Sequence, residues 1–406
     1  MIHLLLAVVV ASFSRLTLDG AQSAAVAHSP DVAIARAKVE EAQALFDAAR
    51  AQYAPTLTAN YAEAPQGGDL GQVVAQRLTT FGATIALGDL FAASPAVAQA
   101  NASLRAAQFD FDDARRSERI AVIGYYYDAL DALATADART AAVRDAQAQL
   151  RAAHLRFRAG DAPRLDEVRA SVALANAQAD LARAAADAQN ATDTLAQETA
   201  VDSAALVTTA RDESVTPLIP TDVHAAVRLA LSLRPEIASA QADVDAETHA
   251  VEVAKRAGIP AVTLAGGYTT GVDTGIKVSG PSANLTMTVP LGGAAHDRVA
   301  AEEARLAQAQ AQLEKVRRSI TVSVGAAVRT ETAQGVALAA AERALREAKA
   351  QYDATQIGYR SGASSSLDVE SARTTYVAAL VAELSAYYDV VRAQATLQML
   401  MGDEHA

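Results

Sequence analysis

The sequence has 406 residues, of which 51% are hydrophobic and 20% charged, and it contains neither cysteine nor tryptophan. The lack of cysteine excludes disulfides, thiolate metal sites and thiol nucleophiles, and a formal net charge of -12 argues against a nucleic-acid-binding protein, which needs a basic face. Because aromatic residues make up only 4%, the core must be built largely from alanine, leucine and valine, which favours closely packed helices.

The N-terminus has the pattern of an export signal. An apolar run extends from Leu4 to Val10, and small residues lead to Ala25-Val26-Ala27 just before His28. The run is too short for a transmembrane helix. Residues 1-27 are therefore predicted to be a cleaved signal peptide. Since no other stretch approaches the roughly 20 apolar residues of a spanning helix, any membrane insertion must use strands.

One sequence pattern occurs twice, with an offset of 202 residues. The copies run from Phe157 to Asp166 and from Tyr359 to Asp368. In each, an aromatic residue and an arginine lead into glycine, three turn-forming residues and Leu-Asp. Glycine ends helices, so each copy is predicted to be the tip of a helical hairpin. The chain is interpreted as a tandem duplication, with structural repeats at 28-220 and 221-406.

Proline spacing predicts long helices. No proline lies between Pro95 and Pro163, between Pro163 and Pro217, or after Pro290, and proline breaks helix interiors. The stretch from about Ser94 to Arg158 is thus predicted to be one helix of ~65 residues. Hydrophobic residues spaced by seven indicate coiled-coil packing; they are Val143, Leu150 and Phe157, and then Leu338, Leu345, Tyr352 and Tyr359.

Each long helix is preceded by a shorter helix and a pair of strands. The shorter helices are predicted from Pro30 to Pro55 and from Pro235 to Pro260. Alternation of polar and apolar residues then predicts strands, and Gly-rich loops are expected at Pro65 to Gly71 and Gly271 to Pro281. The predicted strands are Thr56 to Tyr61, Val73 to Leu87, Val262 to Tyr268 and Ser282 to Val289.

Four strands cannot close around a lumen, although a transmembrane sheet must close. An oligomer that shares one barrel would solve this problem, with apolar side chains facing lipid and polar ones facing water. The alternative is a pair of solvent-exposed hairpins that cap a helical rod. The lipid-facing set is Leu57, Tyr61, Leu285, Met287 and Val289, and the water-facing set is Thr56, Thr58, Asn60, Thr286 and Thr288.

Taken together, these motifs resemble the TolC-like outer-membrane efflux channels over essentially the whole mature chain. The resemblance rests on Pro-Asp-Val at 30–32 and Pro-Glu-Ile at 235–237, on Ala54-Pro55-Thr56-Leu57 and Ile259-Pro260-Ala261-Val262, on Val289-Pro290-Leu291, and on the duplicated tips.

The resemblance implies a mainly α fold with a small β part. Duplicated coiled-coil hairpins would form an α-barrel, and two β-hairpins per chain would contribute to a transmembrane β-barrel shared by a homotrimer. It also implies a passive duct in the outer membrane of a Gram-negative-type cell, extending into the periplasm. A periplasmic adaptor and an inner-membrane transporter would open its tips. Residues 200–220 and the tail after Met401 would belong to a belt around the tunnel.

The resemblance also assigns residues to the tip. Tyr359 and Asp166 match the linking Tyr and Asp of the family, and Asp368 matches an entrance aspartate. Ser364 replaces a linking Arg, and Ser371 replaces a second entrance aspartate, next to Glu370. For Asp166 and Asp368 the alternative is that they cap the returning helix. The turn and adaptor-contact residues are Gly160, Asp161, Arg164, Gly362 and Ser364.

No catalytic, cofactor or metal motif stands out in the sequence. Neither a phosphate-binding Gly-Lys-Ser/Thr loop nor a paired-His zinc motif is present, so an enzyme is not expected. Two functions stay open: an outer-membrane export duct, and a periplasmic coiled-coil structural or adaptor-like protein without a pore. The sequence does not identify the cargo, and drugs, metal ions and proteins all remain open.

Overall fold

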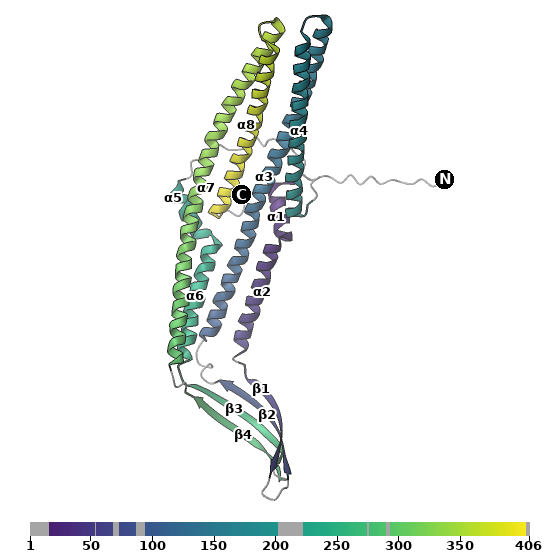
Figure 1. Cartoon of the computed structure of the whole chain (residues 1–406). Coiled ribbons are helices and arrows are strands. Elements are labelled where there is room, and N and C mark those ends of the chain that lie inside the picture. The colour runs from purple at the N-terminus through teal and green to yellow at the C-terminus, as the bar shows by residue number, and fades with distance from the viewer. Residues whose placement is uncertain are drawn as a thin grey trace, which may run out of the picture. The chain divides into compact units, whose positions relative to one another are not determined.

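The computed structural model describes residues 16–52, 54–67, 73–86, 94–201, 222–273, 276–289 and 293–402. A helix, two strands, a very long helix, a tip and a returning helix follow one another in each half of the chain (Figure 1). The elements in chain order are α1 (Leu18–His28), α2 (Pro30–Ala51), β1 (Thr56–Gly67), β2 (Val73–Ala86), α3 (Pro95–Ala159), α4 (Arg164–Thr199), α5 (Val223–Leu233), α6 (Pro235–Arg256), β3 (Ala261–Asp273), β4 (Ile276–Thr288), α7 (Ala294–Ser361) and α8 (Ser366–Met401).

Three of the helices begin at prolines, as the proline spacing predicts. Helix α3 has 65 residues and begins at Pro95, which confirms the single long helix predicted there. Helices α2 and α6 each have 22 residues and begin at Pro30 and Pro235, where the fixed φ of proline suits a first turn. The mainly helical fold class is thus confirmed. No helix within the described ranges is long and apolar enough to cross a membrane.

The chain divides into two compact units, each of which draws on both repeats. One unit comprises Met1–Ala33, Asp113–Arg234 and Ser319–Ala406, and the other comprises Ile34–Asp112 and Pro235–Arg318. The repeats are therefore not separate compact bodies. The predicted boundary between repeats falls outside the described residues, as do most of the predicted belt segment 200–220 and nearly all of the tail after Met401.

The packing of helix α1 bears on where the predicted signal peptide ends. The apolar run that suggested a signal lies within residues 1–15, outside the described residues. Ala25, in contrast, belongs to α1, where Ala21 and Ala25 are fully buried against Val122, Ala129 and Leu195. Cleavage after Ala27 would remove this packing, so we expect any leader to end before Leu18.

Small residues form the cores of both units. In the unit that holds the strands, the buried residues are mainly alanines of α3 and α6, which allow the helices to approach closely. Polar contacts add to this packing: Arg105 pairs with Asp245 at 3.3 Å, and Ser239 donates to Asp110 at 2.5 Å. The buried residues of these two helices include Ala102, Leu104, Ala106, Ala240, Ala242, Ala246 and Ala250.

A polar cluster joins α3 to α8. Asp131 accepts a hydrogen bond from Ser385 at 3.1 Å, and Arg392 pairs with both Asp128 and Asp389. Burial, together with the nearby Asp389 and Asp128 carboxylates, raises the pKa of Asp131. The ionised form of this side chain is therefore less favourable in the folded protein than in the unfolded chain.

Asp131→Asn is expected to raise the melting temperature at neutral pH. A raised carboxyl pKa favours the folded state at low pH, and this contribution is lost as pH rises through the folded pKa. The amide keeps an acceptor for Ser385 but carries no charge, so its advantage should shrink as pH falls and vanish below about pH 3, where aspartate is protonated in both states. Circular dichroism melts across pH would test this. A lower melting temperature at pH 7 would contradict it, and Asp128→Asn, which breaks an ion pair, should be destabilising.

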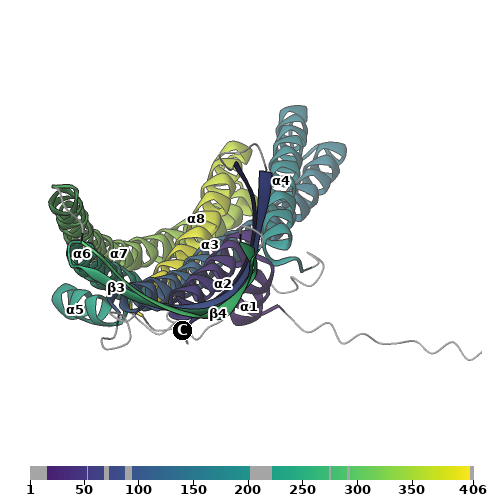
Figure 2. The same ribbon diagram turned by 90° about the horizontal axis from the view of Figure 1, so that it is seen from below.

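The four strands form one antiparallel sheet in the order β1-β2-β3-β4, and the sheet is curved (Figure 2). Two predicted loops are shorter than expected, since β1 continues through Pro65 to Gly67 and β4 already begins at Ile276 and contains Pro281. The Gly and Pro signals predict loops, but β1 and β4 are the edge strands of the sheet within one chain, and edge strands tolerate proline. A glycine is required at position 271 because β2 and β3 approach closely there: a Cβ at Gly271 would lie 2.0 Å from the Arg77 carbonyl oxygen.

The register separates the sheet into an apolar and a polar face. Thr80 and Thr269 hydrogen-bond on the polar face at 3.1 Å, with Thr56, Thr58, Asn60, Thr286 and Thr288 on the same side. Val289, predicted with the apolar set, lies just beyond β4. We call the other side the apolar face; it carries Leu57, Ala59, Tyr61, Phe81, Ala83, Ile85, Val262, Leu264, Tyr268, Leu285 and Met287.

Candidate site at the hairpin tips

Each tip turns on a glycine in the left-handed region. Gly160 has φ +82° and Gly362 has φ +81°, a conformation that other residues rarely adopt. Equivalent hydrogen bonds close the two helix ends, since Asp161 N donates to Arg156 O at 2.9 Å and Ala363 N donates to Gly358 O at 2.7 Å. The duplicated pattern therefore produces the same turn twice, as its glycine predicts.

The returning helices begin differently, and this separates the roles of the two aspartates. Helix α8 starts with a capping box in which the Ser365 side chain accepts from Asp368 N and the Asp368 carboxylate accepts from Ser365 N. Donation to this carboxylate from the Ser365 hydroxyl at 2.7 Å, and from Ser365 N at 2.8 Å, lowers the pKa of Asp368. At α4 the N-cap is Pro163, which has no side-chain cap bond. Asp368 thus caps its own helix, whereas Asp166 is left available for another partner.

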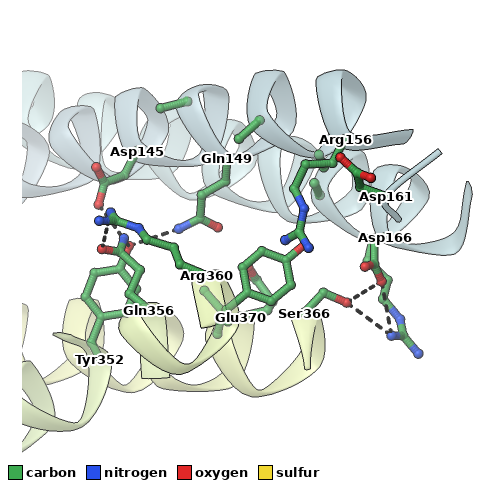
Figure 3. A pocket seen from close by; sticks show the side chains of 17 residues that line it. Asp145, Gln149, Arg156, Asp161, Asp166, Tyr352, Gln356, Arg360, Ser366 and Glu370 are labelled. Carbon is green, nitrogen blue, oxygen red and sulfur yellow. Dashed lines mark hydrogen bonds and ion pairs between the residues drawn. The ribbon is translucent and has the colours of Figure 1, made fainter. Parts of the chain in front are cut away.

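Asp166 links the two hairpins. Its carboxylate accepts a 2.6 Å hydrogen bond from Ser366 Oγ, the first residue of α8, and Figure 3 shows these two side chains facing each other. Arg169 donates to Ser366 Oγ at 3.3 Å and lies 3.9 Å from the Asp166 carboxylate. The Asp166 side chain is only 14% exposed, so this contact joins α4 to α8 with little competition from water.

A second contact between the hairpins is centred on the Tyr352 hydroxyl. Gln149 of α3 donates to it at 2.9 Å, Gln356 donates at 3.1 Å, and the hydroxyl donates to Asp145 of α3 at 3.4 Å. Tyr352 is buried, and its ring stacks on Tyr376 with centroids 5.7 Å apart. Burial, with the nearby Asp145 carboxylate, raises the pKa of this phenol. Tyr352 therefore stays neutral and continues to donate at physiological pH.

Tyr359 makes the third contact through its ring. The Arg156 guanidinium of α3 lies 4.6 Å from the ring centroid, a distance typical of a cation–π interaction. The resemblance assigns both Tyr359 and Asp166 to the link that closes the tip. In this structure each of them contacts the opposite hairpin through a different residue, Tyr359 through Arg156 and Asp166 through Ser366.

These contacts surround a groove between the hairpins, which we call the tip groove. It has a volume of about 640 Å³ and is lined by residues of α3, α4, α7 and α8 (Figure 3). Asp161 and Glu370 both line it, and Glu370 pairs with the buried Arg373 through two bonds of 2.7 and 3.1 Å. Arg164 lines another groove, within the first hairpin, and His154 lines the same groove. The tip groove therefore combines the predicted Asp161, Asp166, Tyr359 and Glu370.

Ser364 is held by the turn of the second tip. Its backbone N donates to Gly358 O at 3.2 Å, and a side chain at Gly358 would place Cβ 2.4 Å from Ser364 Oγ.

Metal binding is not indicated at the tips: in the part of the chain that the structure describes, no group of three His, Cys, Asp or Glu side chains is arranged to hold an ion.

The sequence matches the family described as outer membrane efflux protein over residues 21–200 and 226–403. The chain belongs to this family. Protein CyaE of Bordetella pertussis is 28% identical over 367 residues, covering 84% of this chain and 71% of CyaE. A membrane protein from Pseudomonas aeruginosa has the same fold with a TM-score of 0.83 at 18% identity, covering 95% of this chain and 92% of its own. The outer-membrane channel OprN has a TM-score of 0.82 at 20% identity, covering 96% and 91%.

Membership of the outer membrane efflux protein family identifies the chain as an export channel of the outer membrane and not an enzyme. It decides against a periplasmic structural protein without a pore. Within this channel protein, sequence reasoning missed Ser366, Arg169, Arg156 and Gln149. Pro163 carried a readable signal, because a proline N-cap has no hydroxyl to engage Asp166 as Ser365 engages Asp368. No signal in the sequence indicates that α3 and α7 lie close together.

Proposed function

We propose that three copies of this chain form one outer-membrane duct, which a periplasmic adaptor and an inner-membrane transporter open at the hairpin tips. The duct is passive, and selection of cargo belongs to the transporter. The observation that carries the proposal is the tip groove, where two helical hairpins of one chain are joined by a few polar contacts rather than by an apolar core.

The sheet supports the trimer. One face of the sheet carries apolar side chains, which suit contact with lipid, and the other carries polar side chains, which suit contact with water. Within one chain, β1 and β4 are open edges. In the antiparallel order β1-β2-β3-β4, β4 of one copy can pair with β1 of the next in antiparallel sense. Three copies would then close a barrel of twelve strands. Closure satisfies the backbone groups of both edges, which lipid leaves without partners.

The tip contacts support opening by a partner. The three contacts consist of hydrogen bonds and one cation–π interaction, each bond generally contributing about 0.5–3 kcal/mol, so a docked partner can offset their loss. The lining of the tip groove carries four carboxylates and three guanidinium groups, those of Asp145, Asp161, Asp166 and Glu370 and of Arg156, Arg169 and Arg360. An excess of carboxylates at such an entrance favours cations by simple electrostatics.

Cell fractionation followed by sizing of the detergent-extracted protein tests the proposal. We expect the chain in the outer-membrane fraction, released by detergent and eluting as a trimer. The purified protein should form pores in planar bilayers. Release without detergent as a monomer, with no conductance, would reject the proposed duct.

A further inference from the structure

The apolar face of the sheet ends in a row of charges. The register places Glu63 opposite Arg77, Arg77 opposite Val272, and Val272 opposite Lys277. We call these four residues the charged row. Arg77 and Lys277 are the only arginine and lysine in the four strands, and both fall in this row and on this face.

The charged row lies at one rim of the apolar band. Met287 and Lys277 are on the same face of β4, and ten residues of strand rise by about 33 Å. With a tilt of about 40°, that length spans about 25 Å of membrane, the height of the apolar band of such barrels. Between them lie rows that contain Leu285, Phe81 and Tyr61. The row therefore meets the headgroup layer at the end of the sheet away from the helices.

The row has one positive charge in excess. Arg77 Nε donates to one oxygen of Glu63 at 2.8 Å, and Tyr61 donates to the other oxygen at 2.9 Å. The carboxylate is thereby engaged at both oxygens, while the Arg77 side chain remains 63% exposed. Lys277 is exposed and has no acidic partner among the residues that the structure describes.

We propose that Arg77 and Lys277 bind the phosphate of an anionic lipid headgroup in the outer leaflet. The site rests on the proposed function, which places the apolar face in lipid and the loop end of the strands outside the cell. Phosphate oxygens match the terminal guanidinium nitrogens of Arg77 and the ammonium of Lys277. Glu63 orients Arg77 through Nε and also limits the net charge of the row.

Lipid titration of the detergent-solubilised protein, followed by native mass spectrometry, tests the site. The probes are phosphatidylglycerol, which is anionic, and phosphatidylcholine, which has no net charge. Lys277→Gln is expected to weaken phosphatidylglycerol binding about fivefold and to weaken phosphatidylcholine binding less, because the choline cation offsets the charge of its phosphate. Glu63→Gln should strengthen phosphatidylglycerol binding, Lys277→Arg should preserve it, and Lys315→Gln, which removes an exposed charge from α7, is the matched control.

Two results would overturn the site. One is equal phosphatidylglycerol binding by wild type and Lys277→Gln. The other is weakened binding in Glu63→Gln, which would mark the row as structural. Conductance in planar bilayers separates this failure from that of the duct. If the wild type forms pores while the variants bind lipid alike, only the lipid site fails. If the wild type forms no pores, the duct fails and the site with it.

Discussion

Asp166→Ala is expected to raise the open fraction of the channel in planar bilayers. The substitution removes the acceptor of the 2.6 Å bond from Ser366 and a charge near Arg169. Hydrogen bonds to charged groups contribute about 1.5–3 kcal/mol, and partial exposure reduces this to about 1–2 kcal/mol. That loss corresponds to a change of about five- to thirty-fold for each copy of the chain in the ratio of open to closed tips, and a trimer would lose the bond three times.

The control for this prediction is Asp161→Ala. Asp161 also lines the tip groove, so its removal changes the entrance charge equally while leaving the Asp166–Ser366 bond in place. Ser366→Ala should reproduce the effect of Asp166→Ala, and the double variant should add little, because the two residues share one bond. Tyr359→Phe should have a small effect, since the ring stays under Arg156. Equal conductance of Asp166→Ala and wild type would reject the link.

Leu285→Arg is expected to block membrane assembly. Leu285 lies on the apolar face opposite Leu264, and Leu264 lies opposite Ile85. An arginine on the lipid face costs about 2–4 kcal/mol at the bilayer midplane and about 0–1 kcal/mol near the interfaces. Leu285 lies two residues from Met287 at the rim of the apolar band, so its cost falls between these limits, and a trimer would carry it three times. The amount of trimer in the outer-membrane fraction, relative to wild type, measures the effect.

Asn284→Arg is the matched control, one residue away on the polar face opposite Ala265. There the arginine faces water, so assembly should continue and only ion selectivity should change. Equal loss of trimer in both variants would show that the two faces of the sheet are not assigned correctly.

Local signals were sufficient to predict the helices. The gap between Pro95 and Pro163 predicted one helix of the observed length, because proline acts on its own turn and the preceding residue. The glycines at 160 and 362 predicted the tips in the same way, since each takes the positive φ that ends a helix.

The strand limits were harder to predict, because they depend on the position of a strand in the sheet. The sequence patterns place Pro65 and Pro281 in loops, yet Pro65 lies within β1 and Pro281 lies within β4. A proline is tolerated there because, within one chain, each of these two strands has one side without ladder partners. Strand order decides which strands are edges, and strand order is not a local property of the sequence.

The tip contacts show the same limit. Asp166 and Asp368 occupy equivalent positions in the duplicated pattern, but Ser365 engages Asp368 while Pro163 cannot engage Asp166. That difference is visible in the sequence. The partners Ser366 and Arg156 are not, because only the packing of one hairpin against the other brings them near Asp166 and Tyr359.

The most direct test of the tip as the closure is the conductance of the double variant Asp166→Cys, Ser366→Cys under oxidising and reducing conditions. The chain contains no cysteine, so the only disulfide within a chain would join the two hairpins at this contact. Oxidised channels should stay closed, and a reductant should raise their conductance above that of the wild type, because the native bond is then absent. A confirmed disulfide with unchanged conductance on reduction would contradict the assignment of the tips as the closure.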